Sequence, residues 1–155
     1  SCEKDQEAKK QNTYEKKNIP MTGAQENPAV NTAGLGTLDV RYVRGTKLLY
    51  YTVKWQGLTG PVAAMHIHGL APIGYNAGII QNIVTTSNGI FNTLTSGQPT
   101  FGASGTLSGT LLVDGTVIKE QDLLNGLYYL NIHTNLAGFP PGFASGEIRG
   151  QIVFQ

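Results

Sequence analysis

The chain has 155 residues, a formal net charge of +1, and only 14% charged residues. This length fits one domain of ordinary size, and a near-neutral charge without a basic stripe argues against nucleic acid as a partner. No apolar run approaches the roughly 18 residues that a membrane-spanning helix needs.

The first element in chain order is a polar segment that begins at the only cysteine, Cys2, so no internal disulfide can form. Ser1-Cys2 resembles the junction left when a bacterial lipoprotein signal peptide is cleaved, in which case Cys2 carries the lipid. Residues 3–17 are strongly polar and balanced in charge, and cannot bury enough surface to offset their ordering entropy. We expect a flexible tether over residues 1–17, a folded domain over 18–155, and an extracytoplasmic location at an outer membrane or cell surface. An exposed thiol in a frayed tail is the alternative.

Beyond this tether, apolar residues recur with a period of two, which is the signature of strands. Leu38, Val40 and Tyr42, for example, share one face. Strands are predicted at residues 34–43, 47–55, 62–68, 78–84, 105–113, 127–133 and 146–154, with one helical turn at 120–124. Short strands and frequent turn signals indicate an all-β fold: a single antiparallel, Greek-key-like β-sandwich or barrel of about seven to nine strands.

All three histidines lie at strand positions, as His66-Ile67-His68 and as His133. The spacing of two places His66 and His68 on one strand face, roughly 7 Å apart. In the strand at 127–133, the alternation places His133 and Asn131 opposite the best hydrophobic residues. A solvated outer face is one interpretation. Such a face is normally built from Lys, Glu and Thr, and the concentration of every histidine there favours a functional site.

Four motifs resemble those of the CHRD domain, a module named for its occurrence in the animal protein chordin and widespread in bacterial secreted proteins. The motifs are GAQENPAV at 23–30, AMHIHG at 64–69, YLNIHT at 129–134 and GEIRGQ at 146–151. They follow the family's order and span nearly all of residues 18–155. The resemblance implies an extracellular, all-β module whose biochemical role is poorly defined. Two departures from the family pattern are Glu26-Asn27-Pro28-Ala29, where the family has Glu-Val-Pro-Pro, and the apolar segment FPPGF at 139–143.

The sharpest hypothesis is that His66, His68 and His133 bind a transition metal. Three imidazoles suit copper or zinc, and neighbouring strands lie close enough for the rings to converge. An additional ligand or supporting hydrogen bonds are expected from four polar residues of the motifs: Glu26, Asn131, Glu147 and Arg149.

A hydrogen-bonded network is the alternative for the same residues. His133 could donate to Glu147, Arg149 could pair with Glu26 through two nitrogens of its guanidinium fork, and Asn131 could bridge strands. Such a network would fix the strand register without any ligand.

A third hypothesis is a non-enzymatic module that binds an extracellular protein or glycan. The loops at 70–76 and 136–143 directly follow the histidine motifs, so we expect both at the same end of the domain, where they would present Tyr75, Phe139 and Phe143. Enzymatic activity is not indicated: the chain has no Gly-x-Ser-x-Gly nucleophile motif and no phosphate-binding loop. No catalytic residue is assigned.

Overall fold

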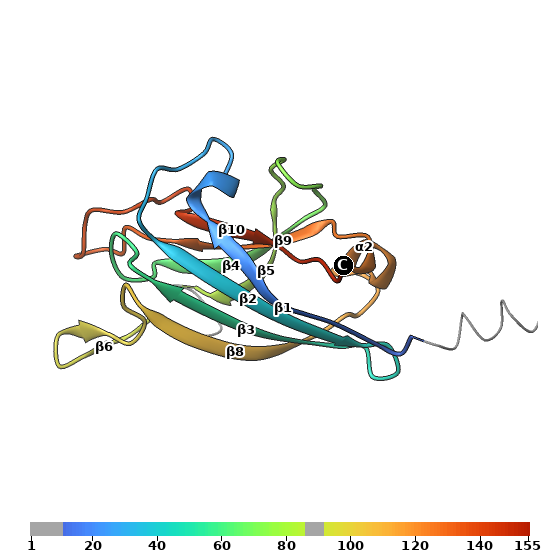
Figure 1. Ribbon diagram of the computed structural model, residues 1–155. Helices are drawn as coiled ribbons and strands as arrows, with labels where there is room; N and C mark the ends of the chain where they lie inside the picture. Colours follow the sequence, from blue (N-terminus) through green and yellow to red (C-terminus); the bar gives the residue numbers. More distant parts are fainter. Residues whose placement is uncertain (1–10, 86–91) are drawn as a thin grey trace, which may run out of the picture.

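The apolar residues that alternate along the chain line one face of an eight-stranded antiparallel sheet (Figure 1). The computed structural model describes residues 11–85 and 92–155. The sheet curls into a half-barrel around its apolar face. The predicted all-β, antiparallel fold is therefore confirmed.

The strand order across the sheet is β5-β4-β9-β10-β1-β2-β3-β8. The bounds of these strands, in chain order, are β1 (Thr13–Thr22), β2 (Leu35–Val43), β3 (Leu48–Gln56), β4 (Ala64–Gly69), β5 (Ile79–Val84), β8 (Gly105–Leu112), β9 (Tyr128–His133) and β10 (Ile148–Gln151). A separate ribbon of β6 (Leu94–Thr95) and β7 (Gln98–Pro99) projects from one end of the sheet in Figure 1. The described residues also form the short 3-10 turn η1 (Gly23–Gln25) and the helix α2 (Glu120–Leu124). None of the helices in this part of the chain is long and apolar enough to cross a membrane.

Strand β1 begins before the predicted domain boundary. Residues 13–16 pair with β2 although Thr13 and Glu15 are exposed, because backbone hydrogen bonds need no apolar side chain. The register shifts between Lys16 and Ile19, and Asn18 has a positive φ of 57°. Asn18, predicted to begin the domain, instead marks an irregularity within β1, and residues 13–17 are strand rather than tether.

The strands that come first and last in the chain, β1 and β10, lie side by side at the centre of the sheet. Thr22 of β1 is paired with Arg149 of β10. This contact joins two groups of strands, β5-β4-β9-β10 and β1-β2-β3-β8. The sheet is therefore complete only when residues from both ends of the described chain have come together.

The core fills the concave face of the half-barrel, as the period-two pattern predicts. Leu38, Val40 and Tyr42 are all at most 2% exposed. Burial of each apolar side chain of this size contributes about 1.5–3 kcal/mol. At the edge of this core the Tyr42 hydroxyl donates to Glu120 Oε1 at 2.7 Å, which ties α2 to β2.

The opposite face of β9 and β10 is also buried, and this burial positions the site. Asn131, Arg149 and Gln151 are each at most 5% exposed. The loop between β4 and β5 covers this face, since Gln151 Nε2 donates to the Ala71 carbonyl at 2.8 Å. The interpretation of these polar residues as a solvated outer face is wrong, because a loop without regular structure encloses them.

Candidate metal centre

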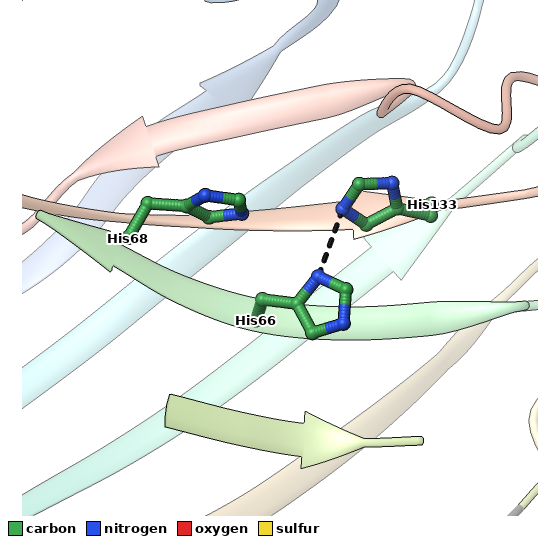
Figure 2. Close-up of side chains that lie close together, drawn as sticks. All are labelled: His66, His68 and His133. Atoms are coloured by element: carbon green, nitrogen blue, oxygen red, sulfur yellow. Dashed lines mark hydrogen bonds between the residues drawn. The ribbon is translucent and has the colours of Figure 1, made fainter. Parts of the chain in front are cut away.

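The three histidines converge on the covered face of β4 and β9. These strands are antiparallel neighbours that pair His66 with Asn131 and Ala64 with His133. Alternation along each strand directs both β4 histidines and His133 to the same side. One ring nitrogen from each histidine lies within 4.8 Å of the other two, and Figure 2 shows the three rings turned toward one another.

Two backbone carbonyls fix where His68 and His133 carry their protons. Nδ1 of His68 lies 2.9 Å from the Ala77 oxygen, and Nδ1 of His133 lies 2.8 Å from the Ala144 oxygen. A carbonyl oxygen can only accept, so each neutral ring donates from Nδ1 and keeps an electron pair on Nε2. Both Nε2 atoms are thereby in the state that a metal ion requires.

The Asn131 amide lies between these two nitrogens. Its Oδ1 is 2.9 Å from His68 Nε2 and 3.0 Å from His133 Nε2, while its Nδ2 is 3.4 Å from Glu26 Oε2. Because both rings carry their protons on Nδ1, three atoms bearing electron pairs face one another. Turning the amide over would bring its oxygen against the Glu26 carboxylate instead.

His66 completes the cluster from β4. Its Nδ1 lies 3.1 Å from His133 Nε2, the contact drawn as a dashed line in Figure 2. In the neutral, metal-free protein His66 is the donor, because His133 donates from its own Nδ1. A metal ion would require His66 to move this proton to Nε2 and offer Nδ1.

The surroundings favour the neutral forms of His66 and His133 by lowering their pKa values. Burial, followed by repulsion from His133 and His68, lowers the pKa of His66 from its ordinary 6.5 to about 4. Burial also lowers the pKa of His133, against the opposing hydrogen bond to Ala144. Protons therefore compete weakly with a metal ion at these two rings.

The stability of the metal-free protein is expected to fall as the pH decreases from about 6.5 to about 4. Over this range the histidines of the unfolded chain, with ordinary pKa values of about 6.5, become protonated. His66 and His133 of the folded protein stay neutral, because their pKa values are lowered. Above pH 6.5 their contribution is complete, and below pH 4 His66 adds no further loss. Chemical denaturation in EDTA at several pH values measures the effect, with His66→Gln as the comparison. An equal pH dependence in His66→Gln would contradict the assignment to this ring.

A buried ion pair supports the Asn131 side of the cluster. Arg149 Nε donates to Glu26 Oε1 at 2.6 Å, and the two side chains are 6% and 3% exposed. The guanidinium lies 3.9 Å from the centroid of the Tyr129 ring, and that ring stacks on His68 at 4.7 Å. The pairing of Arg149 with Glu26 that the sequence suggested is thus present, through one nitrogen rather than a fork.

Glu147 lies outside the histidine cluster and does not accept from His133. Its carboxylate accepts hydrogen bonds from the hydroxyls of three threonines, and the backbone nitrogen of one of them also donates to it. These threonines are Thr32, Thr59 and Thr134, at oxygen–oxygen distances of 2.6, 3.1 and 2.8 Å. They belong to the loops that follow η1, β3 and β9, so Glu147 holds three loops together and supplies no ligand.

The two candidate recognition loops lie at opposite ends of the β4–β9 pair, not at the same end. Because β4 and β9 are antiparallel, the loop after β4 lies beside the start of β9, and the loop after β9 lies beside the start of β4. Tyr75 of the first loop is 65% exposed. Phe139 and Phe143 of the second loop are half-buried, and the Phe143 backbone is held by Thr134. The predicted lipidation site, Cys2, lies outside the described residues.

Several contributors to the cluster were not singled out from the sequence. Tyr129 separates His68 from Arg149, and the Ala77 and Ala144 carbonyls set the histidine tautomers. The position of Tyr129 on the polar face of its strand was the available signal. Backbone carbonyls leave no signal in a sequence.

Comparison with known proteins supports the resemblance of the four motifs. The family model for the CHRD domain matches residues 18–152. A search of curated proteins gave no match, and neither did a search of solved structures. The matched region includes all three histidines, Asn131 and the Glu26–Arg149 pair. The chain therefore belongs to the CHRD domain family.

Proposed function

We propose that the protein is an extracytoplasmic CHRD module that binds one zinc or copper ion through His66, His68 and His133. The observation that carries this proposal is the position of Asn131 Oδ1, 2.9 and 3.0 Å from two imidazole nitrogens whose protons are committed elsewhere. A cation at this convergence would turn a repulsive arrangement into a set of ligands. Protonation is the competing remedy, and the lowered pKa values of His66 and His133 oppose it.

The nitrogen spacing suits a metal of this size. Zinc–nitrogen bonds of about 2.0–2.1 Å in tetrahedral geometry separate ligand nitrogens by about 3.3 Å. His66 Nδ1 and His133 Nε2 are already 3.1 Å apart, and all three ligand nitrogens lie within 4.8 Å. Ring rotations that move atoms by on the order of 1 Å would complete the set.

The supporting hydrogen bonds also match those of metal-binding histidines. Such histidines usually donate their second ring N–H to a carbonyl or carboxylate, which fixes the tautomer and orients the ring. His68 and His133 do so toward Ala77 and Ala144. Three imidazoles and one amide oxygen are neutral donors, and imidazole suits zinc and copper. The Glu26 carboxylate, beyond Asn131, is already paired with Arg149, so these residues add no net charge beside the three neutral imidazole ligands.

The proposed location rests on the sequence that precedes β1. Cys2 followed by a polar, charge-balanced segment resembles the lipid-bearing segment of a lipoprotein. In this proposal a lipid on Cys2 anchors the module to the outer membrane or cell surface, and the polar residues allow it to extend from the membrane.

The test is metal analysis of the chain purified without a histidine tag, followed by calorimetric titration with zinc and copper(II). We expect one ion per chain, bound at micromolar affinity or tighter, and no binding by a His66→Ala/His68→Ala variant. Absence of stoichiometric binding by the unaltered chain would refute the proposal.

A structural hydrogen-bonded network is the second candidate, and the buried Glu26–Arg149 pair favours it. In that case the unaltered chain binds no metal, and the double histidine variant loses thermal stability in EDTA. Metal binding predicts the opposite: the two proteins differ most in stability when zinc is present, because a ligand of the folded state alone raises its stability.

A further inference from the structure

The loop that follows β4 presents apolar side chains to solvent. Leu70, Ile73 and Tyr75 of residues 70–76, here called the apolar loop, are 54%, 68% and 65% exposed. The surrounding sequence is neutral as well, since no Asp, Glu, Lys or Arg occurs between Lys54 and Asp114. In Figure 1 this loop, drawn in green, rises from the sheet above β9 and β10. Exposed apolar side chains gathered in this way are typical of an interaction surface.

The backbone of the apolar loop is held in place from below. Arg149 donates to the Tyr75 carbonyl at 3.1 Å and to Asn76 Oδ1 at 2.7 Å. Asn27 donates to the Gly74 carbonyl at 3.1 Å, and Asn76 donates back to the Asn27 carbonyl at 2.8 Å. The exposed side chains therefore project from an ordered backbone, which lowers the entropy lost when a surface engages them.

The same contacts connect the apolar loop to the histidine cluster. The Ala77 carbonyl, at the end of the loop, accepts from His68 Nδ1 at 2.9 Å and from the Tyr129 hydroxyl at 3.2 Å. Tyr129 lies against both His68 and Arg149, and Arg149 holds the Tyr75 carbonyl. An ion that orients His68 would thus strengthen the hold on the end of this loop beyond the hydrogen bonds already present.

We propose that the apolar loop inserts into the surface of a lipid bilayer and that metal binding at the histidine cluster strengthens this insertion. Leu70 favours a bilayer over a protein partner, because Leu is under-represented among binding hot spots on proteins, whereas Tyr75 is compatible with both. A bilayer accepts Leu and Ile in its hydrocarbon and Tyr at the headgroups. The coupling is reciprocal, so the bilayer should also raise the affinity for metal. This inference rests on the proposed metal site.

The experiment measures binding to phosphatidylcholine vesicles by sedimentation, with Cys2→Ser chains so that no lipid is attached. Ile73→Asp should weaken vesicle binding at least about tenfold, since it places a charge where an apolar group would be buried in the bilayer. The matched control is Leu112→Asp, which alters a side chain of β8 that is 56% exposed, and should leave vesicle binding unchanged. Replacing zinc by EDTA should weaken vesicle binding of the Cys2→Ser chain about fivefold or more. Both Asp variants should retain the unaltered zinc affinity and unfolding curve.

The outcomes separate this inference from the metal site. If zinc binds in solution but vesicles do not bind, or Ile73→Asp behaves like Leu112→Asp, the bilayer inference is overturned and the metal site stands. If vesicle binding is the same in zinc and EDTA, the coupling is overturned. If zinc fails to bind at all, the proposed function itself fails. Self-association that Ile73→Asp abolishes, without vesicle binding, would instead make the loop a protein interface and overturn the inference.

Discussion

Replacing Arg149 by alanine is expected to lower the free energy of unfolding by about 3–5 kcal/mol. The change removes the partner of Glu26, a carboxylate whose side chain is 3% exposed. A charge left unpaired in such a place keeps its full desolvation cost, so breaking a buried pair costs far more than the pair contributes over an apolar replacement. The loss also frees the Tyr75 carbonyl and the Asn76 side chain, which Arg149 holds.

Urea denaturation of the metal-free protein measures this effect. The matched control is Arg44→Ala, which breaks an ion pair with Glu120 where the arginine side chain is 40% exposed, and should cost less than about 1 kcal/mol. Adding Glu26→Gln to Arg149→Ala should recover part of the stability, because it removes the unpaired charge. Equal losses for Arg149→Ala and Arg44→Ala would show that Glu26 is well solvated, contrary to its burial.

Replacing His133 by alanine is expected to weaken zinc binding more than about 100-fold, which exceeds the 10–100-fold cost typical of losing a supporting hydrogen bond. His133 contributes one of the three ligand nitrogens. Its Nε2 also contacts His66 Nδ1, a second ligand, and Asn131 Oδ1. Calorimetric titration gives the affinity, and denaturation in EDTA shows whether the variant still folds.

Asn131→Asp provides the informative comparison. A carboxylate at this position would strengthen metal binding, and would destabilise the metal-free protein by placing a second negative charge 3.4 Å from Glu26. Opposite effects on affinity and stability would show that residue 131 faces the metal. Unchanged zinc affinity in both His133→Ala and Asn131→Asp would place the bound ion elsewhere.

The fold was largely predictable because burial on one sheet face imposes a period of two on the sequence. That pattern correctly gave the buried faces of β2 and β3 and the shared face of His66 and His68. It missed β1 entirely, since no strand was predicted before residue 34, and pairing with β2 also continues where side chains such as Glu15 are exposed. Charge composition alone therefore placed the start of the domain too late.

The site was predictable as a set of residues but not as a set of contacts. Asn131 and the Glu26–Arg149 pair were identified, whereas Glu147 was grouped with them although it binds threonines in three loops. Glu147 neighbours Arg149 on its face by alternation, but which loop covers each residue depends on chain paths that alternation does not encode. The histidine tautomers depend on the Ala77 and Ala144 carbonyls, which every residue type supplies equally.

The pairing of β4 with β9 determines the earliest point in synthesis at which the histidine cluster can form. His66 and His68 are made early, but β9 supplies His133, and β10 supplies the Arg149 that completes the support around Asn131. A nascent chain that stops before Ile148 has neither a closed sheet nor a supported cluster, and contacts this distant in sequence form slowly. In the proposed function, metal loading would therefore follow completion of the fold. For an exported module the ion would come from the compartment where the chain finishes folding, and not from the cytoplasm where it is translated.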